Sequence, residues 1–234
     1  MIKNLKDLIF NWNLFNRDNF IKEISLTLKN KFVLDVGAGS SPYREFFIEN
    51  NKYVTQDAVP LNPEQLRDGQ GYGQIDIISD ISKIPLESKS VDVIICTEVI
   101  EHVPHPIDAL KEMTRLLKTG GLLILTAPLQ SGLHQVPFHF YGGYTPFFYE
   151  KFLNDNFKNI KIMSNGNSYD FLSQEIYRFV RRIFSKALPL FIIAFPFFLL
   201  LFLFTIIIRI GSIIKIFPYD NDFPIGYHVT AIKK

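Results

Sequence analysis

Three carboxylates and two glycines stand where a nucleotide-like ligand could be held. Asp35 lies near the end of the apolar run VLDV, and Gly37 and Gly39 follow it. Glycine lets the backbone turn sharply beneath a ligand, and the helix expected next would point its N-terminus at the same crevice. Asp57 and Asp80 end the next two apolar segments. The pattern predicts a ligand site at the carboxyl ends of parallel strands.

The residue types narrow the class of ligand. A dinucleotide fingerprint would place a third glycine where Pro42 stands, and the glycine loop has no lysine for a polyphosphate. Asp57 is placed to accept hydrogen bonds from both hydroxyls of a ribose, and Asp80 to reach an exocyclic amine such as adenine N6. We therefore expect a cofactor with a ribose, an adenine and a positively charged centre. Ordinary helix N-caps are the alternative role for both carboxylates.

The elements that must position these residues alternate along the chain. Apolar, β-branched segments predict strands, and segments with helical spacing or helix-start and helix-stop signals predict helices. Strands are expected within 31–41, 52–59, 74–81, 90–100, 122–128, 157–165 and 225–234, and helices within 20–30, 42–50, 105–121, 147–156 and 167–186. The predicted fold is α/β and Rossmann-like: a seven-stranded, mostly parallel sheet with helices on both faces, plus a hydrophobic helical insert before the last strand.

Taken together, these segments resemble class I S-adenosylmethionine-dependent methyltransferases over about residues 20–165 and again from near 225. LDVGAGS is similar to the first motif of that family, ISDISKIPLESKSVDVII to its adenine-binding region, and TEVIEHVPHPIDALKEMTRLLKTGGLLILTAP to its later motifs. The resemblance implies S-adenosylmethionine as cofactor and a last strand that inserts antiparallel beside the fifth. It also implies a set of cofactor-binding residues: Asp35, Gly37, Ala38 and Gly39 at the methionine portion, Asp57 at the ribose, Asp80 and Ile81 at the adenine, and Thr97 and Glu98 beside the sulfonium.

The segment LHQVPFHFYGGYTPFFYEKFL is similar to bacterial surface-polysaccharide methyltransferases, except that Gly143 replaces an arginine expected before YTP. Methyl transfer needs mainly alignment and exclusion of water, and a base helps if the acceptor is a hydroxyl. We predict His134 and His139 as general base or substrate-shaping residues, and Tyr141 and Tyr144 as lining for the acceptor.

The pair Glu101 and His102 is expected to order the loop after the fourth strand. No set of histidines and carboxylates has the spacing of a metal site, so none is predicted. A net charge of +2 gives no electrostatic case for a nucleic-acid partner. The lone Cys96, within an apolar strand, is expected in the core and fits a reducing compartment.

From Ala187 to Ile208 the chain has no charged side chain, and 22 residues in a helix span roughly 33 Å, enough to cross a bilayer core. A single crossing would separate the last strand from its sheet. We therefore expect a hairpin bent near Pro196, or helices lying in the interface, with Lys186, Arg209 and Lys215 at one surface. Arg178, Arg181, Arg182 and Lys186 are expected to face anionic headgroups. A true span and a fully soluble packing are the alternatives.

The expected organisation is an N-terminal amphipathic segment 1–19 without a secretory signal, a methyltransferase domain 20–166 and 224–234, and a basic and hydrophobic membrane-associating insert 167–223. Residues 178–217 would contact the cytoplasmic face of a membrane. The expected function is O-methylation of a small-molecule, lipid-linked or surface-glycan precursor in polysaccharide biosynthesis. The alternatives are methylation of a quinone or other membrane lipid, and a catalytically degenerate, cofactor-binding membrane partner.

Overall fold

The computed structural model describes residues 10–66, 69, 71–186, 189, 192, 194–216, 218 and 220–234. The first half of the predicted N-terminal segment, residues 1–9, lies outside this set, as do residues 187, 188, 190, 191 and 193 of the hydrophobic run. The chain divides into two compact units. One contains Asp18–Met163 and Gly226–Lys234, and the other contains Met1–Arg17 and Ser164–Ile225.

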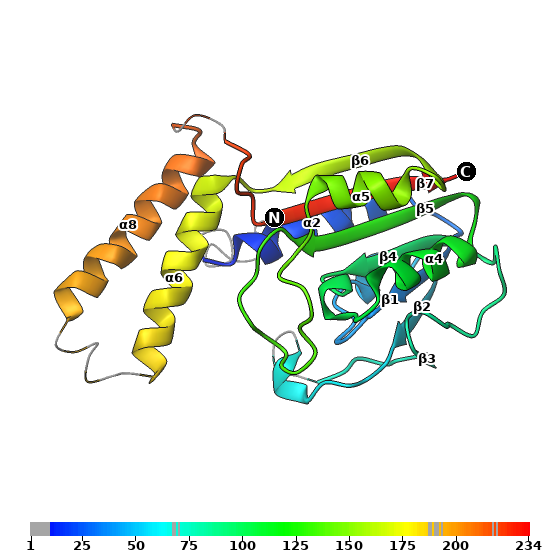
Figure 1. The fold of residues 1–234 in the computed structure, drawn as a ribbon, viewed down its shortest axis with the longest axis horizontal. Coiled ribbons are helices and arrows are strands. Elements are labelled where there is room, and N and C mark those ends of the chain that lie inside the picture. Colours follow the sequence, from blue (N-terminus) through cyan, green and yellow to red (C-terminus); the bar gives the residue numbers. More distant parts are fainter. Residues whose placement is uncertain are drawn as a thin grey trace. The chain divides into compact units, whose positions relative to one another are not determined.

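The first unit is built on a seven-stranded sheet with the order β3-β2-β1-β4-β5-β7-β6 (Figure 1). Its strands are β1 (Phe32–Val36), β2 (Lys52–Asp57), β3 (Ile77–Ile78), β4 (Val91–Thr97), β5 (Leu117–Pro128), β6 (Phe157–Asn165) and β7 (Gly226–Lys233). The first five strands pair in parallel, and β7 pairs antiparallel with β5. The predicted fold class is confirmed, including the antiparallel last strand.

Successive side chains of the central strands point to opposite faces of the sheet, and each face has its own apolar core. Leu34 and Ile94 face the core formed with α4 (Pro106–Leu116) and α5 (Pro146–Leu153). Their neighbours Val33 and Val93 face a second core with Ile21 of α2 (Trp12–Ser25) and the short helix α3 (Arg44–Phe47). Because both faces are covered, the central strands β1 and β4 are mostly apolar. Cys96 is fully buried in β4, as expected.

Three elements are shorter than the sequence predicts. β3 pairs with β2 only through Ile77 and Ile78, because the carboxylate of Asp76 takes the backbone N–H of Thr55 at 3.0 Å in place of a carbonyl group. The predicted helix after Pro42 is the single turn α3. α4 ends at Leu116 rather than at the two glycines, because Leu117 is already extended and pairs with Val91.

The second unit contains the antiparallel helices α6 (Ser168–Lys186) and α8 (Phe195–Ile213), which lie side by side (Figure 1). Asp170 at the start of α6 forms an ion pair with Arg209 near the end of α8 and accepts a hydrogen bond from Ser212 at 2.7 Å. The Arg209 guanidinium lies 3.7 Å from the centre of the Trp12 ring. The two ends of this hairpin are therefore joined by a buried polar cluster.

This cluster corrects one expectation. Arg209 is only 1% exposed, so it is part of the interior of the unit and not a flanking surface charge. Pro196 lies in the first turn of α8, where proline needs no hydrogen-bond partner, so the second helix of the hairpin begins next to Pro196.

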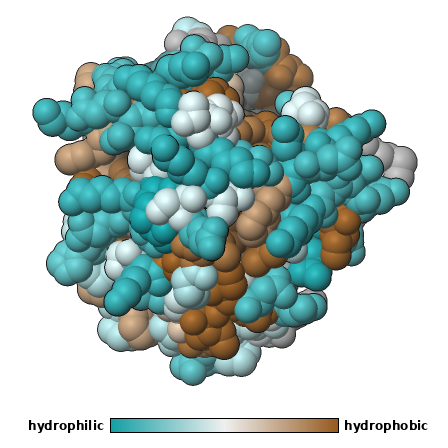
Figure 2. All heavy atoms as spheres, turned by 90° about the vertical axis from the view of Figure 1, so that its right-hand side faces the viewer, coloured by the Kyte–Doolittle hydropathy of each residue, from teal (hydrophilic) through white to brown (hydrophobic). Residues whose placement is uncertain are grey.

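The surface of α8 is mostly apolar. Among the described residues, α8 is the one helix whose length and composition would allow it to cross a membrane. Its exposed side chains include Phe195, Phe197, Leu199, Leu200, Leu203, Phe204, Ile207 and Ile210. By contrast, the face of the molecule shown in Figure 2 is largely hydrophilic and has only limited hydrophobic areas.

Candidate active site

The turn after β1 requires glycine at its first position. Gly37 has a φ of +68°, and a Cβ atom there would lie 2.5 Å from Cγ2 of Val99. Gly39 also has a positive φ, of +54°. Between them, Ala38 donates its N–H to the carbonyl oxygen of Gln56 at 3.0 Å. The turn is thus fixed against the ends of β2 and β4, at the carboxyl edge of the sheet.

Asp57 joins this turn to the end of β2. One carboxylate oxygen accepts the backbone N–H of Gly39 at 2.9 Å, and the other accepts the N–H of Val59 at 2.7 Å. The side chain is 8% exposed. Asp57 is therefore a brace between two loops and not the helix N-cap considered as its alternative role. Its contact with a ribose stays a prediction.

Asp35 is more deeply buried than a ligand-contacting carboxylate needs to be. It is 2% exposed and accepts a hydrogen bond from the hydroxyl group of Tyr53. Burial raises the pKa of Asp35 to about 7; the Tyr53 hydrogen bond acts in the opposite direction, and the charge of Asp57 adds to the rise. The predicted contact of Asp35 with the methionine portion stays a prediction.

Asp80 and Ile81 lie in the segment that follows β3. Asp80 is exposed and accepts hydrogen bonds from the N–H and the hydroxyl of Ser82, both at 2.7 Å. These hydrogen bonds lower the pKa of Asp80, so the carboxylate is ionised at neutral pH. Ile81 is 9% exposed. The pair thus presents a charged and an apolar group side by side, as the predicted adenine contacts require.

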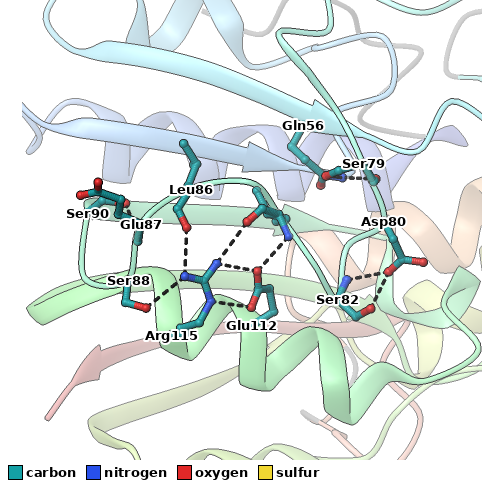
Figure 3. Close-up of polar contacts among 11 residues, drawn as sticks. Gln56, Ser79, Asp80, Ser82, Leu86, Glu87, Ser88, Ser90, Glu112 and Arg115 are labelled. Atoms are coloured by element: carbon teal, nitrogen blue, oxygen red, sulfur yellow. Dashed lines mark hydrogen bonds and ion pairs between the residues drawn. The ribbon is translucent and has the colours of Figure 1, made fainter.

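A network on α4 holds this segment in place (Figure 3). The Arg115 guanidinium donates to both carboxylate oxygens of Glu112 and to three acceptors in the segment: the carbonyl oxygens of Ile84 and Leu86 and the hydroxyl of Ser88. Glu112 also accepts the N–H of Ile84 at 2.8 Å. Upstream, the side-chain amide of Gln56 donates to the carbonyl oxygen of Ser79 at 2.7 Å. The segment 79–88, called the Asp80 loop below, is therefore hydrogen-bonded to both α4 and β2.

Thr97 and Glu98 end β4 at the same edge of the sheet. Glu98 has a φ of +53°, an uncommon conformation for a residue with a side chain. It is held there because its N–H donates to the carbonyl oxygen of Thr126 and its carboxylate accepts the Thr126 hydroxyl, both at 2.9 Å. This locked turn connects the ends of β4 and β5, where the predicted sulfonium neighbours belong.

The loop between β5 and α5 brings the predicted histidines together. The ring centres of His134 and His139 are 4.5 Å apart. His102 of the short helix η3 (Ile100–His102) joins them, with ring centres 4.7 Å from His134 and 5.6 Å from His139. Burial lowers the pKa of His102 to about 4 and also lowers the pKa of His139. Both rings are therefore neutral at pH 7 and able to accept a proton.

The same loop is anchored at several points. The N–H groups of Phe140 and Tyr141 donate to the carbonyl oxygen of Glu101, at 3.0 and 3.1 Å. Gln135 donates to the carbonyl oxygen of Gln65, and Gln65 donates back to that of Val136, at 3.0 and 3.1 Å. Gln65 belongs to the 3-10 helix η1 (Pro63–Gln65), which follows the Asp57 loop. The loop therefore connects the histidine cluster with the predicted ribose side.

The two predicted substrate tyrosines differ in exposure. Tyr141 is 39% exposed and donates its hydroxyl to the carbonyl oxygen of Pro104 at 2.9 Å. Tyr144 is only 6% exposed, and its hydroxyl donates to the carbonyl oxygen of Ile100 at 2.8 Å. Tyr144 thus packs in the core, and contact of either tyrosine with an acceptor stays a prediction. At Gly143 a Cβ would lie 2.4 Å from the Pro128 carbonyl oxygen, so the expected arginine does not fit.

Sequence reasoning underestimated two residues of this region. His102 was assigned to loop ordering, yet it is a member of the histidine cluster. Gln65, which the sequence pattern does not single out, links two loops of the site. The EH pair in VIEHV was the available signal for His102, whereas nothing in the sequence around Gln65 indicates its partner 70 residues away.

Comparisons with known proteins agree with this geometry. Residues 34–125 match the family described as "Methyltransferase domain". The chain is 31% identical over 112 residues to a ubiquinone biosynthesis O-methyltransferase of Coxiella burnetii, covering 44% of this chain and 46% of the relative. It is 33% identical over 130 residues to a tRNA U34 carboxymethyltransferase of Nautilia profundicola, covering 53% of this chain and 43% of the relative. The aligned region thus spans less than half the length of these relatives.

Solved structures show the same fold. A SAM-dependent methyltransferase from Archaeoglobus fulgidus superposes with a TM-score of 0.52 at 16% identity, covering 93% of both chains. Phosphoethanolamine N-methyltransferase 2 of Haemonchus contortus, solved in complex with S-adenosyl-L-methionine, superposes with a TM-score of 0.52 at 15% identity, covering 93% of this chain and 52% of that one. Residues 34–125 therefore belong to a methyltransferase domain, and the fold around them is the one shared by solved S-adenosylmethionine-dependent methyltransferases, as the resemblance implies.

Proposed function

We propose that this chain is an S-adenosylmethionine-dependent methyltransferase that works at a membrane surface and O-methylates a small-molecule, lipid-linked or surface-glycan acceptor. The observation that carries the cofactor assignment is the brace formed by Asp57. Its carboxylate fixes the glycine turn, and the turn, Asp80 and Glu98 all lie at the carboxyl edge of one sheet. In a doubly wound fold this edge is where the ligand binds.

The residues at this edge suit S-adenosylmethionine. Asp57 would hold the ribose, Asp80 and Ile81 would frame the adenine, and the turn at Gly37 would leave room for the methionine portion. The cofactor supplies an already activated methyl group. The chain would contribute alignment of the acceptor and exclusion of water, and the rings of His134 and His139 would act as general base or shape the site for a hydroxyl acceptor.

The membrane assignment rests on the α6–α8 hairpin. Large apolar side chains along α8 are exposed, which is unfavourable in water and favourable in a lipid phase. The exposed Arg178, Arg181 and Arg182 lie along α6, where they would contact anionic headgroups. Because β7 pairs with β5, the chain returns after the hairpin to the sheet that it left. We therefore place the catalytic domain at the cytoplasmic face and the hairpin in the membrane or its interface.

A quinone or another membrane lipid is the second candidate acceptor. It is favoured by the relatives named as ubiquinone biosynthesis O-methyltransferases, which match at 31–33% identity. The third candidate is a catalytically degenerate partner protein. Such a protein would bind the cofactor without transferring its methyl group, so a methyl-transfer assay is needed besides cofactor binding to distinguish it from an enzyme.

Two binding measurements test the proposal. Calorimetry with the wild-type chain should detect S-adenosylmethionine, and Gly37→Arg should abolish binding because no side chain fits beside Val99. Absence of binding to a folded wild type would overturn the enzyme assignment.

In the second measurement, the chain should float with vesicles that contain anionic lipid. Flotation should weaken in the double variant Arg181→Ala/Arg182→Ala and not in Lys158→Ala/Lys161→Ala, which removes two exposed charges from β6. Equal flotation of both double variants would contradict the role of the α6 arginines.

A further inference from the structure

Next to the predicted cofactor edge, the structure gathers three side chains that can bind a metal ion. Glu101 and His102 come from η3, and His134 comes from the loop after β5. One ligand atom from each of the three lies within 4.8 Å of the other two. The shortest described separation, between a Glu101 carboxylate oxygen and Nε2 of His102, is 3.8 Å.

These separations are close to what a bound ion needs. Zn²⁺ binds imidazole nitrogen and carboxylate oxygen at about 2.0–2.2 Å, which places tetrahedral ligands roughly 3.3–3.6 Å from one another. The pair Glu101 and His102 is within a few tenths of an ångström of that range. His134 is exposed and lies on a loop, so the remaining approach of about 1 Å can be made by its side chain.

The hydrogen bonds of both histidines prepare them as ligands. Nδ1 of His102 lies 2.7 Å from the carbonyl oxygen of Phe138, and Nδ1 of His134 lies 2.9 Å from that of Gly132. A carbonyl oxygen can only accept, so each Nδ1 must carry the hydrogen. Nε2 of each ring is then left with the lone pair that a metal ligand requires. Backbone carbonyls are frequent partners of metal-bound histidines for this reason.

The third histidine of the cluster has a different role. Nε2 of His139 lies 3.1 Å from the hydroxyl of Ser131, and its ring packs beside His134. It therefore supports the position of His134 and is not needed as a ligand. The three-residue set is two histidines and one carboxylate, which leaves at least one coordination position open.

We propose that Glu101, His102 and His134 form a binding site for a divalent transition-metal ion of the zinc class. Nitrogen ligands favour Zn²⁺ and its first-row neighbours over Mg²⁺ and Ca²⁺, which prefer all-oxygen sites. In a methyltransferase, the open position of such an ion would hold the oxygen atom of the acceptor, and His139 rather than the ligand His134 would then be the ring left to take its proton. That role rests on the proposed function, whereas binding of the ion does not.

Sequence spacing alone could not indicate this site. Glu101 and His102 are adjacent, and the third ligand lies 32 residues further along the chain, beyond α4 and β5. The hydrogen bonds from Phe140 and Tyr141 to the Glu101 carbonyl oxygen bring the loop to η3 and so complete the set.

The test uses the full chain, purified without a histidine tag and stripped of metal with a chelator. Titration with Co²⁺, followed by its visible absorption, should show one equivalent bound through nitrogen and oxygen ligands, and Zn²⁺ should displace it while Mg²⁺ should not. His134→Ala should weaken Co²⁺ binding by at least about 100-fold, since even loss of a supporting residue typically costs 10–100-fold. The matched control is His105→Ala, an exposed histidine of the same segment outside the cluster, which should bind Co²⁺ like the wild type.

His134 is exposed, so its removal leaves the fold intact, and Glu101→Gln provides a second test of the ligand set. Wild-type Co²⁺ binding that is absent, or that is unchanged in His134→Ala, would overturn the proposal. Calorimetry with S-adenosylmethionine is run on the same preparations. A chain that binds the cofactor but not Co²⁺ would contradict the metal site alone, and a chain that binds Co²⁺ but not the cofactor would contradict the proposed function alone.

Discussion

At the scale of single residues, three aspartates that stand at or near the ends of predicted strands have very different environments. Asp57 braces two loops, Asp80 is exposed and hydrogen-bonded to Ser82, and Asp35 is buried against Tyr53. The sequence indicated all three because each ends an apolar strand. Their environments depend on side chains from other strands, such as Tyr53, which the pattern of β1 does not reveal.

The first prediction concerns Asp57. Asp57→Ala should weaken S-adenosylmethionine binding by about 10-fold or more, because a hydrogen bond to a charged group contributes roughly 1.5–3 kcal/mol. Asp92→Ala is the control, since Asp92 accepts hydrogen bonds from Phe32 and Lys118 at the amino-terminal end of β4. Calorimetry measures both. Equal losses in the two variants would mean that Asp57 acts only through the fold.

The second prediction concerns pH. The pKa of Asp35 is raised from 3.8 to about 7, so between these values the folded chain keeps a proton that the unfolded chain has released. Asp35 therefore makes the free energy of unfolding fall as pH rises from about 4 to about 7, and it has no further effect above pH 7. Asp35→Asn should remove this fall, as measured by urea unfolding across that range. Parallel profiles for wild type and variant would contradict the assignment.

At the scale of elements, the strands were predicted well and the ends of helices less well. β1, β2, β4, β6 and β7 lie within their predicted ranges. For β1 and β4 the reason is that buried parallel strands carry mostly apolar residues. The end of α4 was missed because pairing of Leu117 with Val91 overrides the glycine stop signal. The histidine cluster was only half predicted, because contacts between two loops leave no periodic pattern in the sequence.

The third prediction concerns the network on α4. Arg115→Leu should lower the free energy of unfolding by about 2 kcal/mol and weaken S-adenosylmethionine binding, because Glu112 loses its cation and the Asp80 loop loses three hydrogen bonds. Lys111→Leu on the same helix is the control. Its ion pair with Asp108 is exposed and should contribute little. Chemical unfolding measures the stability of both variants, and calorimetry measures their binding of S-adenosylmethionine. Equal effects of Arg115→Leu and Lys111→Leu would contradict the role of the network.

The fourth prediction concerns the base of the hairpin. Asp170→Ala should destabilise the α6–α8 unit by roughly 3–5 kcal/mol, because it leaves Arg209 buried without its carboxylate. Glu175→Ala, which removes an exposed ion pair with Arg178 from the same helix, should have little effect. Limited proteolysis in detergent should cut α6 and α8 faster in Asp170→Ala only. Unchanged cleavage would show that the buried pair does not hold the hairpin together.

At the scale of the whole molecule, the hydrophobic run is an insertion between β6 and β7 of one sheet. A single crossing of the membrane would require β7 to leave the sheet, whereas it forms seven registered pairs with β5. The side chains of Asn167, before α6, and Ser212, near the end of α8, form a hydrogen bond of 3.1 Å. The chain therefore enters and leaves the hairpin at the same end. The chain thus returns to its sheet after the hydrophobic run, as the pattern of β7 predicts, and insertion of that run into a membrane stays a prediction.

The fifth prediction follows from this topology. Cys96 is buried, so single cysteines introduced at Lys29 and Lys234 can be labelled selectively. Both positions should react with an impermeant maleimide in inside-out membrane vesicles and not in intact cells. Labelling of Lys234→Cys from outside intact cells would place the end of the chain on the opposite side and contradict the hairpin.

The most direct test of the central claim is transfer of a labelled methyl group. The wild-type chain is incubated with methyl-labelled S-adenosylmethionine and either a membrane-lipid extract or a pool of sugar nucleotides, with Gly37→Arg as the inactive control. We predict label in the lipid-extractable fraction with the wild type and none with Gly37→Arg. Chemical analysis of the labelled lipid separates a lipid-linked glycan from a quinone. Label only in the sugar-nucleotide pool would contradict a lipid acceptor and assign a small-molecule glycan precursor instead, and label in neither pool would contradict the proposed methyltransferase.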